Sequence, residues 1–200
     1  MRKLITLLLL LCALTGAAAA DDFGQSYQDF QTLYAQNVDF INANTGRHLL
    51  PLTFTGAFDS EGERYYVLAS GALYAEIYLD DLASQIASCE VTLAAPAGMS
   101  YGDSLYNDFL TSGYHSYALL MAMSKAPTAA ERYALVEEVN NGTAENAGLY
   151  ETQVNDYHLT CLSANGTATM RFENELLLGT GLEALEQEEL PSEVEIAIQN

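Results

Sequence analysis

LYAEIYL, residues 73–79, is the stretch that decides the fold. Apolar residues stand at positions 73, 75, 77 and 79, while Tyr74, Glu76 and Tyr78 stand between them. Successive side chains of a β-strand point to opposite faces of a sheet, so the alternation predicts one apolar face toward a core and one amphipathic face away from it. Such a strand is typical of an antiparallel sheet that is covered on one side.

Further runs of strand length flank this stretch. Residues 49–58 and 65–68 precede it, and residues 86–94 follow it after the turn signal Asp80-Asp81. Because only short turns separate these runs, they predict an antiparallel meander over residues 48–96.

A second group of strands is predicted over residues 148–173. The run has an interruption at Asn155-Asp156 and a hairpin signal at Asn165-Gly166. Asn-Gly favours the type I′ turn, which joins two antiparallel strands tightly.

The segment 22–44 carries apolar residues at helical spacing and predicts a helix. Asp22, with Gln25 three residues later, resembles a capping box at its start, and Gly46 suits the position just after its end.

Residues 103–140 are predicted to be helical as well. Pro127 stops a first helix, and Thr128 with Glu131 forms a Thr-x-x-Glu capping box that starts a second one. The chain order is therefore helix, strands, helices, strands.

This order predicts a two-layer α+β fold, in which an antiparallel sheet built from residues 48–96 and 148–173 is packed on one face by helices. The repeated order also raises the alternative of a duplicated α-plus-meander unit, although no residue-level self-similarity supports it.

Residues 1–20 have the pattern of a secretory signal peptide. Arg2 and Lys3 precede an apolar run at 5–14, and small residues follow at 17–20. We therefore expect a secreted protein, extracellular or in the cell envelope. The mature chain is expected to comprise a single domain over residues 21–182 and an acidic C-terminal tail over 183–200. No other stretch approaches the roughly 20 apolar residues of a membrane span.

The charge excludes one class of partner. The chain has 27 acidic and 7 basic residues, and loss of Arg2 and Lys3 with the signal would change the formal net charge from −20 to −22. Nothing remains to form the basic stripe that phosphate contacts need, so we expect no nucleic-acid binding.

Two cysteines, Cys89 and Cys161, follow the signal segment. In an oxidising compartment two remaining thiols predict one disulfide, closing a loop of about 70 residues that would stabilise the fold by about 4 kcal/mol. The alternative is two buried, inert thiols.

Motifs for catalysis, metals or cofactors are not found in the sequence. His48, His115 and His158 lie far apart, without metal-ligand spacing. Asp59–Glu63 carries three carboxylates, but its composition favours a turn over a calcium site. Gly179–Ala184 matches the Gly-x-Gly-x-x-Ala pattern of dinucleotide-binding proteins. Only 16 residues follow it, which is too few for the second strand and ribose-binding acid that such a site requires.

The sequence thus favours a secreted, non-catalytic binding or accessory protein without a cofactor. Its candidate ligand-binding residues are Tyr65, Tyr74, Glu76 and Tyr78, because a tyrosine row beside a carboxylate can hold an extracellular protein, peptide or glycan. The alternative is a small secreted hydrolase that uses carboxylates or a site centred on His115.

Overall fold

The computed structural model describes residues 24–58, 64–80, 85–174 and 177. The expected signal peptide, the acidic tail and the 59–63 turn therefore lie outside the described residues.

The described elements alternate between helices and meanders along the chain. The first half contains α2 (Tyr27–Thr45), β1 (Thr55–Phe58), β2 (Arg64–Ser70), β3 (Leu73–Leu79) and β4 (Ile86–Ala94). The second half contains α3 (Ser104–Ala122), α4 (Ala129–Glu145), β5 (Leu149–Val154), β6 (Tyr157–Ala164) and β7 (Thr167–Glu173).

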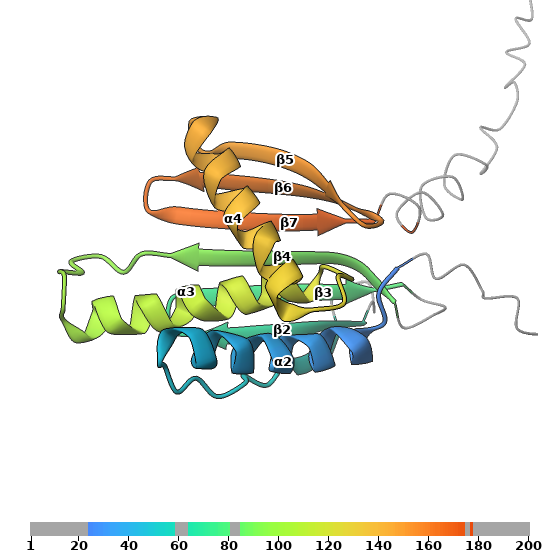
Figure 1. The fold of residues 1–200 in the computed structure, drawn as a ribbon, viewed down its shortest axis with the longest axis horizontal. Coiled ribbons are helices and arrows are strands. Elements are labelled where there is room, and N and C mark those ends of the chain that lie inside the picture. Colours follow the sequence, from blue (N-terminus) through green and yellow to red (C-terminus); the bar gives the residue numbers. More distant parts are fainter. Residues whose placement is uncertain (1–23, 59–63, 81–84, 175–176, 178–200) are drawn as a thin grey trace, which may run out of the picture.

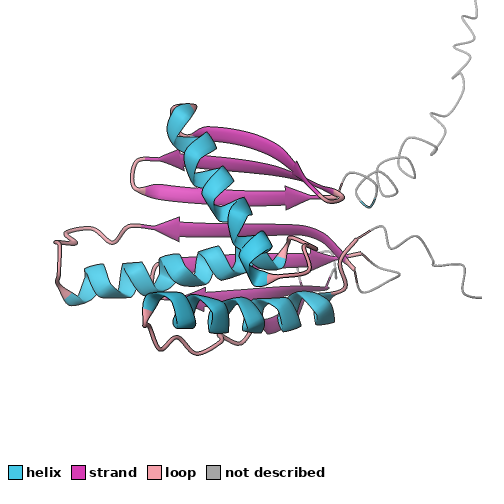
Figure 2. Ribbon diagram, viewed as in Figure 1, coloured by secondary structure: helices cyan, strands magenta, loops and turns pink. Residues whose placement is uncertain are grey.

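The predicted fold class is confirmed. The seven strands of the described chain form one antiparallel sheet in the order β1-β2-β3-β4-β7-β6-β5. The described helices α2, α3 and α4 lie over one face of this sheet, with α4 crossing the strands obliquely (Figures 1 and 2). The opposite face, on the far side in these views, is called the outer face below.

The two meanders meet at the centre of the sheet. β4 and β7, the last strand of each half, pair antiparallel, with Val91 opposite Met170. This layout has the helix-then-meander order of the duplicated-unit alternative. The described parts of the halves nevertheless differ, because the first contributes one helix and four strands and the second contributes two helices and three strands.

Local signals account for several of the boundaries. Thr128 and Glu131 form the predicted capping box, in which each side chain accepts from the backbone N–H of the other. Asn165 and Gly166 have φ values of 53° and 77°, as a type I′ hairpin turn requires. Gly46 ends α2 in the left-handed conformation with φ 67°.

The predicted start of the first helix is wrong. The N-cap is Ser26, whose hydroxyl accepts from the Asp29 backbone N–H, rather than Asp22. Gln25 lies outside the helix because it has tertiary partners: its Nε2 donates to the Ala122 carbonyl at 2.7 Å, and its backbone N–H donates to the Tyr157 hydroxyl at 3.0 Å. Long-range bonds therefore fix this boundary.

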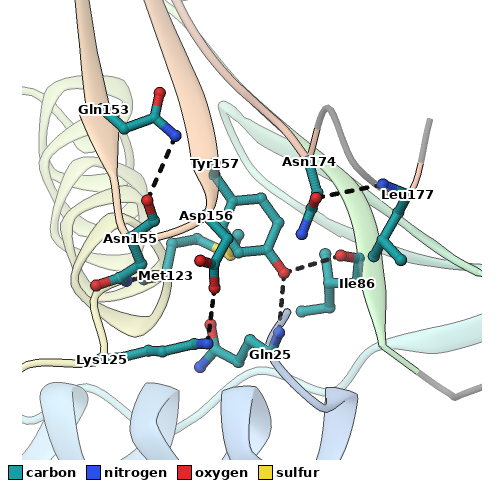
Figure 3. Close-up of polar contacts among 10 residues, drawn as sticks. All are labelled: Gln25, Ile86, Met123, Lys125, Gln153, Asn155, Asp156, Tyr157, Asn174 and Leu177. Carbon is teal, nitrogen blue, oxygen red and sulfur yellow. Dashed lines mark hydrogen bonds and ion pairs between the residues drawn. The ribbon is translucent and has the colours of Figure 1, made fainter. Parts of the chain in front are cut away.

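Figure 3 shows how Tyr157 joins the segment before α2 to the sheet. The Tyr157 ring is fully buried, and its hydroxyl donates to the Ile86 carbonyl at 2.8 Å while it accepts from Gln25. Nearby, Asn155 Nδ2 donates to the Met123 carbonyl at 3.0 Å and links the β5–β6 turn to the end of α3 (Figure 3).

The core lies between the sheet and the helices. Its apolar residues come from the inward positions of the central strands and from the facing sides of the helices, and the most buried include Phe30, Val38, Leu68, Ala75, Ile77, Val91, Leu119 and Phe172. Ala75 and Ile77 are the odd positions of the stretch LYAEIYL. The alternation therefore predicted correctly which face of β3 meets the helices.

A buried arginine ties the three helices together. Arg132 on α4 is 2% exposed, and its Nε donates to Asn37 Oδ1 on α2 at 2.8 Å. Its Nη1 donates to the carbonyls of Ala126 and Pro127 at 2.9 and 3.3 Å. Asn37 Nδ2 in turn donates to the Ala118 carbonyl on α3 at 3.2 Å.

Candidate functional site on the outer face of the sheet

The strand register brings all four predicted binding residues to the outer face. Tyr74, Glu76 and Tyr78 alternate with the buried positions of β3. Tyr65 on β2 is the direct cross-strand partner of Tyr78. The four residues therefore occupy one continuous area on two neighbouring strands, opposite to the side that the helices cover.

The tyrosines of this area are ordered by their neighbours. The rings of Tyr65 and Tyr78 stack with centroids 5.1 Å apart and planes inclined by 11°. Tyr74 is 44% exposed, and its hydroxyl donates a hydrogen bond to Glu76 Oε1. That bond raises the pKa of Tyr74 to about 12, so its hydroxyl keeps its proton at neutral pH. The face thus presents aromatic surface with fixed polar groups.

Further charged residues extend the area across the sheet. Glu76 is directly opposite Glu90 on β4, and Glu90 is directly opposite Arg171 on β7. Arg171 Nη2 contacts Glu173 Oε1 at 3.1 Å, whereas its Nε is 4.0 Å from Glu90 Oε2. Two carboxylates therefore face the Arg171 guanidinium, and Glu76 adds a third carboxylate on the far side of Glu90, so the area keeps a negative charge.

Glu90 and Arg171 were missed by the sequence prediction, and the cause is topological. They belong to strands separated by the whole α3–α4–β5–β6 segment, and only the pairing of β4 with β7 makes them neighbours. Ser88, Glu90 and Thr92 are polar residues at alternate positions of β4. This alternation could have predicted that Glu90 lies on the exposed side of the strand.

The predicted disulfide is not formed, and this prediction is corrected. Cys89 and Cys161 are both free and buried. They lie on β4 and β6, and β7 runs between these strands, so two strand spacings of about 4.8 Å separate them. A disulfide needs Cα atoms within about 7 Å. Burial instead raises the pKa of each thiol to about 12, which keeps both protonated and unreactive.

His115, the centre of the alternative hydrolase site, lies inside the helical layer. It is 3% exposed, and its Nδ1 is 2.9 Å from the Tyr34 hydroxyl. The Leu52 backbone N–H donates to that hydroxyl oxygen at 3.3 Å, and the hydroxyl proton can in turn donate to Nδ1 in the tautomer that leaves this nitrogen unprotonated. Burial lowers the pKa of His115. The ring is thus shielded by its neighbours, and its contacts fit a role in packing.

Within the described ranges, no group of three or more His, Cys, Asp or Glu side chains is arranged to hold a metal ion. None of the helices in this part of the chain combines the length and the apolar composition needed to cross a membrane.

Comparison of the chain with models of protein families, with curated proteins and with solved structures gave no match. The class of protein is therefore defined by the fold and by the face just described. It is a two-layer α+β protein whose antiparallel sheet carries helices on one side and an acidic, tyrosine-bearing surface on the other.

Proposed function

We propose that this chain is a secreted, non-catalytic binding protein that holds a basic peptide segment of an extracellular partner on the outer face of its sheet. The observation that carries the proposal is the direct opposition of Glu76 and Glu90 beside the tyrosines. Like charges at directly opposite positions destabilise a sheet. A cationic side chain placed between them relieves that repulsion, and the folded protein gains stability from the partner.

The tyrosines supply the second part of the recognition. An exposed ring such as that of Tyr74 offers large contact area at little conformational cost, and its face attracts lysine or arginine cations. The stacked pair of Tyr65 and Tyr78 adds a rigid apolar platform beside it. Arginine-containing peptides match both features better than a neutral glycan, because they pair with carboxylates as well as with rings.

The test is a titration of the mature chain with an arginine-rich decapeptide, followed by NMR of the backbone amides. Shift changes should concentrate on β3, β4 and the facing part of β2, and binding should weaken as salt is raised. A glutamate-rich decapeptide of equal length should not bind. Shift changes confined to the helical layer would contradict the proposal.

A matched pair of double variants separates local from overall charge. E76Q with E90Q should weaken binding at least tenfold. E137Q with E145Q removes the same charge from exposed positions of α4 and should change binding by less than twofold. Sequencing of the exported protein tests the localisation, since cleavage after residue 20 is expected to leave Asp21 as the first residue.

A further inference from the structure

A hollow lies on the helix-covered side of the sheet, inside the helical layer. It is a cleft of about 510 Å³ between α3, α4 and the strands beneath them, and its lining includes Leu93, Tyr117, Val139, Thr143, Cys161 and Met170. In Figure 1, α4 crosses over the strands and diverges from α3. We call it the α3–α4 cleft. It is separate from the outer face, because the sheet lies between them.

The lining of the α3–α4 cleft differs in charge from the rest of the protein. The chain carries 27 acidic residues, yet none of the described side chains that line the cleft is charged. Aliphatic side chains in the walls alternate with five hydroxyl-bearing residues and one asparagine. An ion that entered would lose its hydration without meeting an opposite charge, which is costly. The cleft therefore fits a neutral ligand.

One polar atom at the cleft lacks a partner. The hydroxyl oxygen of Thr143, a lining residue on α4, is buried and has no hydrogen-bond partner among the described residues. Buried polar groups are nearly always paired in folded proteins, and an unpaired one destabilises the fold. In the rotamer shown this oxygen is closed off from the cleft. Threonine in a helix populates two χ1 rotamers, so rotation of the side chain would turn the oxygen into the cleft, where a ligand hydroxyl could supply the missing hydrogen bond.

A smaller hollow adjoins the cleft at Tyr117. It measures about 250 Å³, it is lined by Phe40, Tyr114, Tyr133 and neighbouring residues of α2, and Tyr117 lines both hollows. Its described lining is likewise uncharged. The main cleft alone has the volume of typical small-molecule sites, which run from about 300 to 1,000 Å³.

From these observations we infer that the α3–α4 cleft binds an uncharged small molecule with an apolar chain or ring body and one hydroxyl group. The apolar body lies against Leu93, Val139 and Met170, and the hydroxyl reaches Thr143. This inference is independent of the proposed outer-face function, since it concerns the opposite side of the sheet.

The first experiment uses the mature chain and a neutral fluorescent probe, N-phenyl-1-naphthylamine. Its fluorescence should rise saturably with one site per chain, and 1-decanol should displace it. Decanoate and decyltrimethylammonium have the same chain with a charge, and each should require at least tenfold higher concentration. Equal displacement by the charged analogues, or no saturable binding, would overturn the inference. So would a stable dimer that excludes the probe, because a second copy would then be the occupant.

Variants locate the site. A168W places an indole on the cleft-lining side of β7 and should weaken probe binding at least tenfold. A94W places the same ring on the neighbouring strand β4 at an exposed position of the outer face, and should change binding by less than twofold. If A168W does not fold, A144W replaces it, since Ala144 lines the cleft from an exposed position of α4. Equal effects of the cleft variant and A94W would contradict the assignment.

The last variant tests the hydroxyl contact. T143V keeps the shape of the side chain and removes its oxygen. It should weaken decanol binding at least threefold while leaving the affinity for naphthalene, which has no hydrogen-bonding group, within twofold. An unchanged affinity for decanol would show that Thr143 does not receive the hydroxyl group and would overturn that part of the inference.

Discussion

Glu76 on β3 and Glu90 on β4 are direct cross-strand neighbours on an exposed face. Carboxylates at such positions repel each other, and the Arg171 guanidinium lies closer to Glu173 than to Glu90. The folded protein therefore keeps an electrostatic repulsion that a single substitution can remove.

E90Q should stabilise the free protein by about 0.5 kcal/mol, because it removes the like-charge contact while the hydrogen bond from Tyr74 to Glu76 stays. Urea unfolding at low salt measures the gain. The gain should shrink at 0.5 M salt, since screening already weakens the repulsion there. A loss of stability at low salt would show that the Arg171 contact outweighs the repulsion.

R132M should destabilise the protein by about 3 kcal/mol. The buried guanidinium is the donor for Asn37 Oδ1 and for two backbone carbonyls, and methionine leaves these acceptors unpaired. R132K should recover only part of the loss, because one ammonium group cannot reproduce the planar set of donors. Urea unfolding measures both, and R47M, at a partly exposed arginine, serves as the control with an expected loss below about 1 kcal/mol.

Stability should fall as the pH is lowered from 7 toward 5, and His115 should account for part of that fall. Burial lowers its pKa in the folded state below the ordinary value of about 6.5. Between the two pKa values the unfolded chain binds more protons, so stability is fully present above about 6.5 and decreases below it. H115Q should flatten the pH profile in this window, whereas H48Q, at an exposed histidine, should not. Identical profiles for the two variants would refute the assignment.

Protein purified without reductant should contain two free thiols per mature chain. Because both cysteines are buried and burial raises their pKa to about 12, the native protein should react with Ellman's reagent far more slowly than the urea-unfolded protein. Reductant should leave the thermal midpoint unchanged. Absence of thiols in the unfolded chain would restore the Cys89–Cys161 disulfide.

The alternation of LYAEIYL predicted a strand and its two faces because side-chain period is a local property of the backbone. Thr128-x-x-Glu131 and Asn165-Gly166 placed a helix start and a turn for the same reason. By contrast, Ser26 replaced Asp22 as the cap because Gln25 bonds to Tyr157 and Ala122, which are remote in sequence.

Prediction of the rest of the site would have required the order of the strands in the sheet, and local sequence patterns do not specify that order. Nothing in the sequence near Cys89 or Cys161 indicates that β7 lies between them. The same insertion of β7 makes Arg171 a neighbour of Glu90. The α3–α4 cleft depends on the angle at which the two helices diverge over the sheet. The periodicity of each helix predicts its buried side but does not predict this angle.

The ladder between β4 and β7 also sets the order in which the chain can be completed. Ser88 pairs with Glu173 and Ala94 with Thr167, so every pair in this ladder joins residues at least 73 positions apart. Because the chain is synthesised from its N-terminus, β4 is the open edge of a four-stranded sheet until β7 has been synthesised. Open edges can pair with strands of other chains. The period of greatest aggregation risk for a nascent molecule therefore falls between the appearance of Ala94 and the arrival of Thr167.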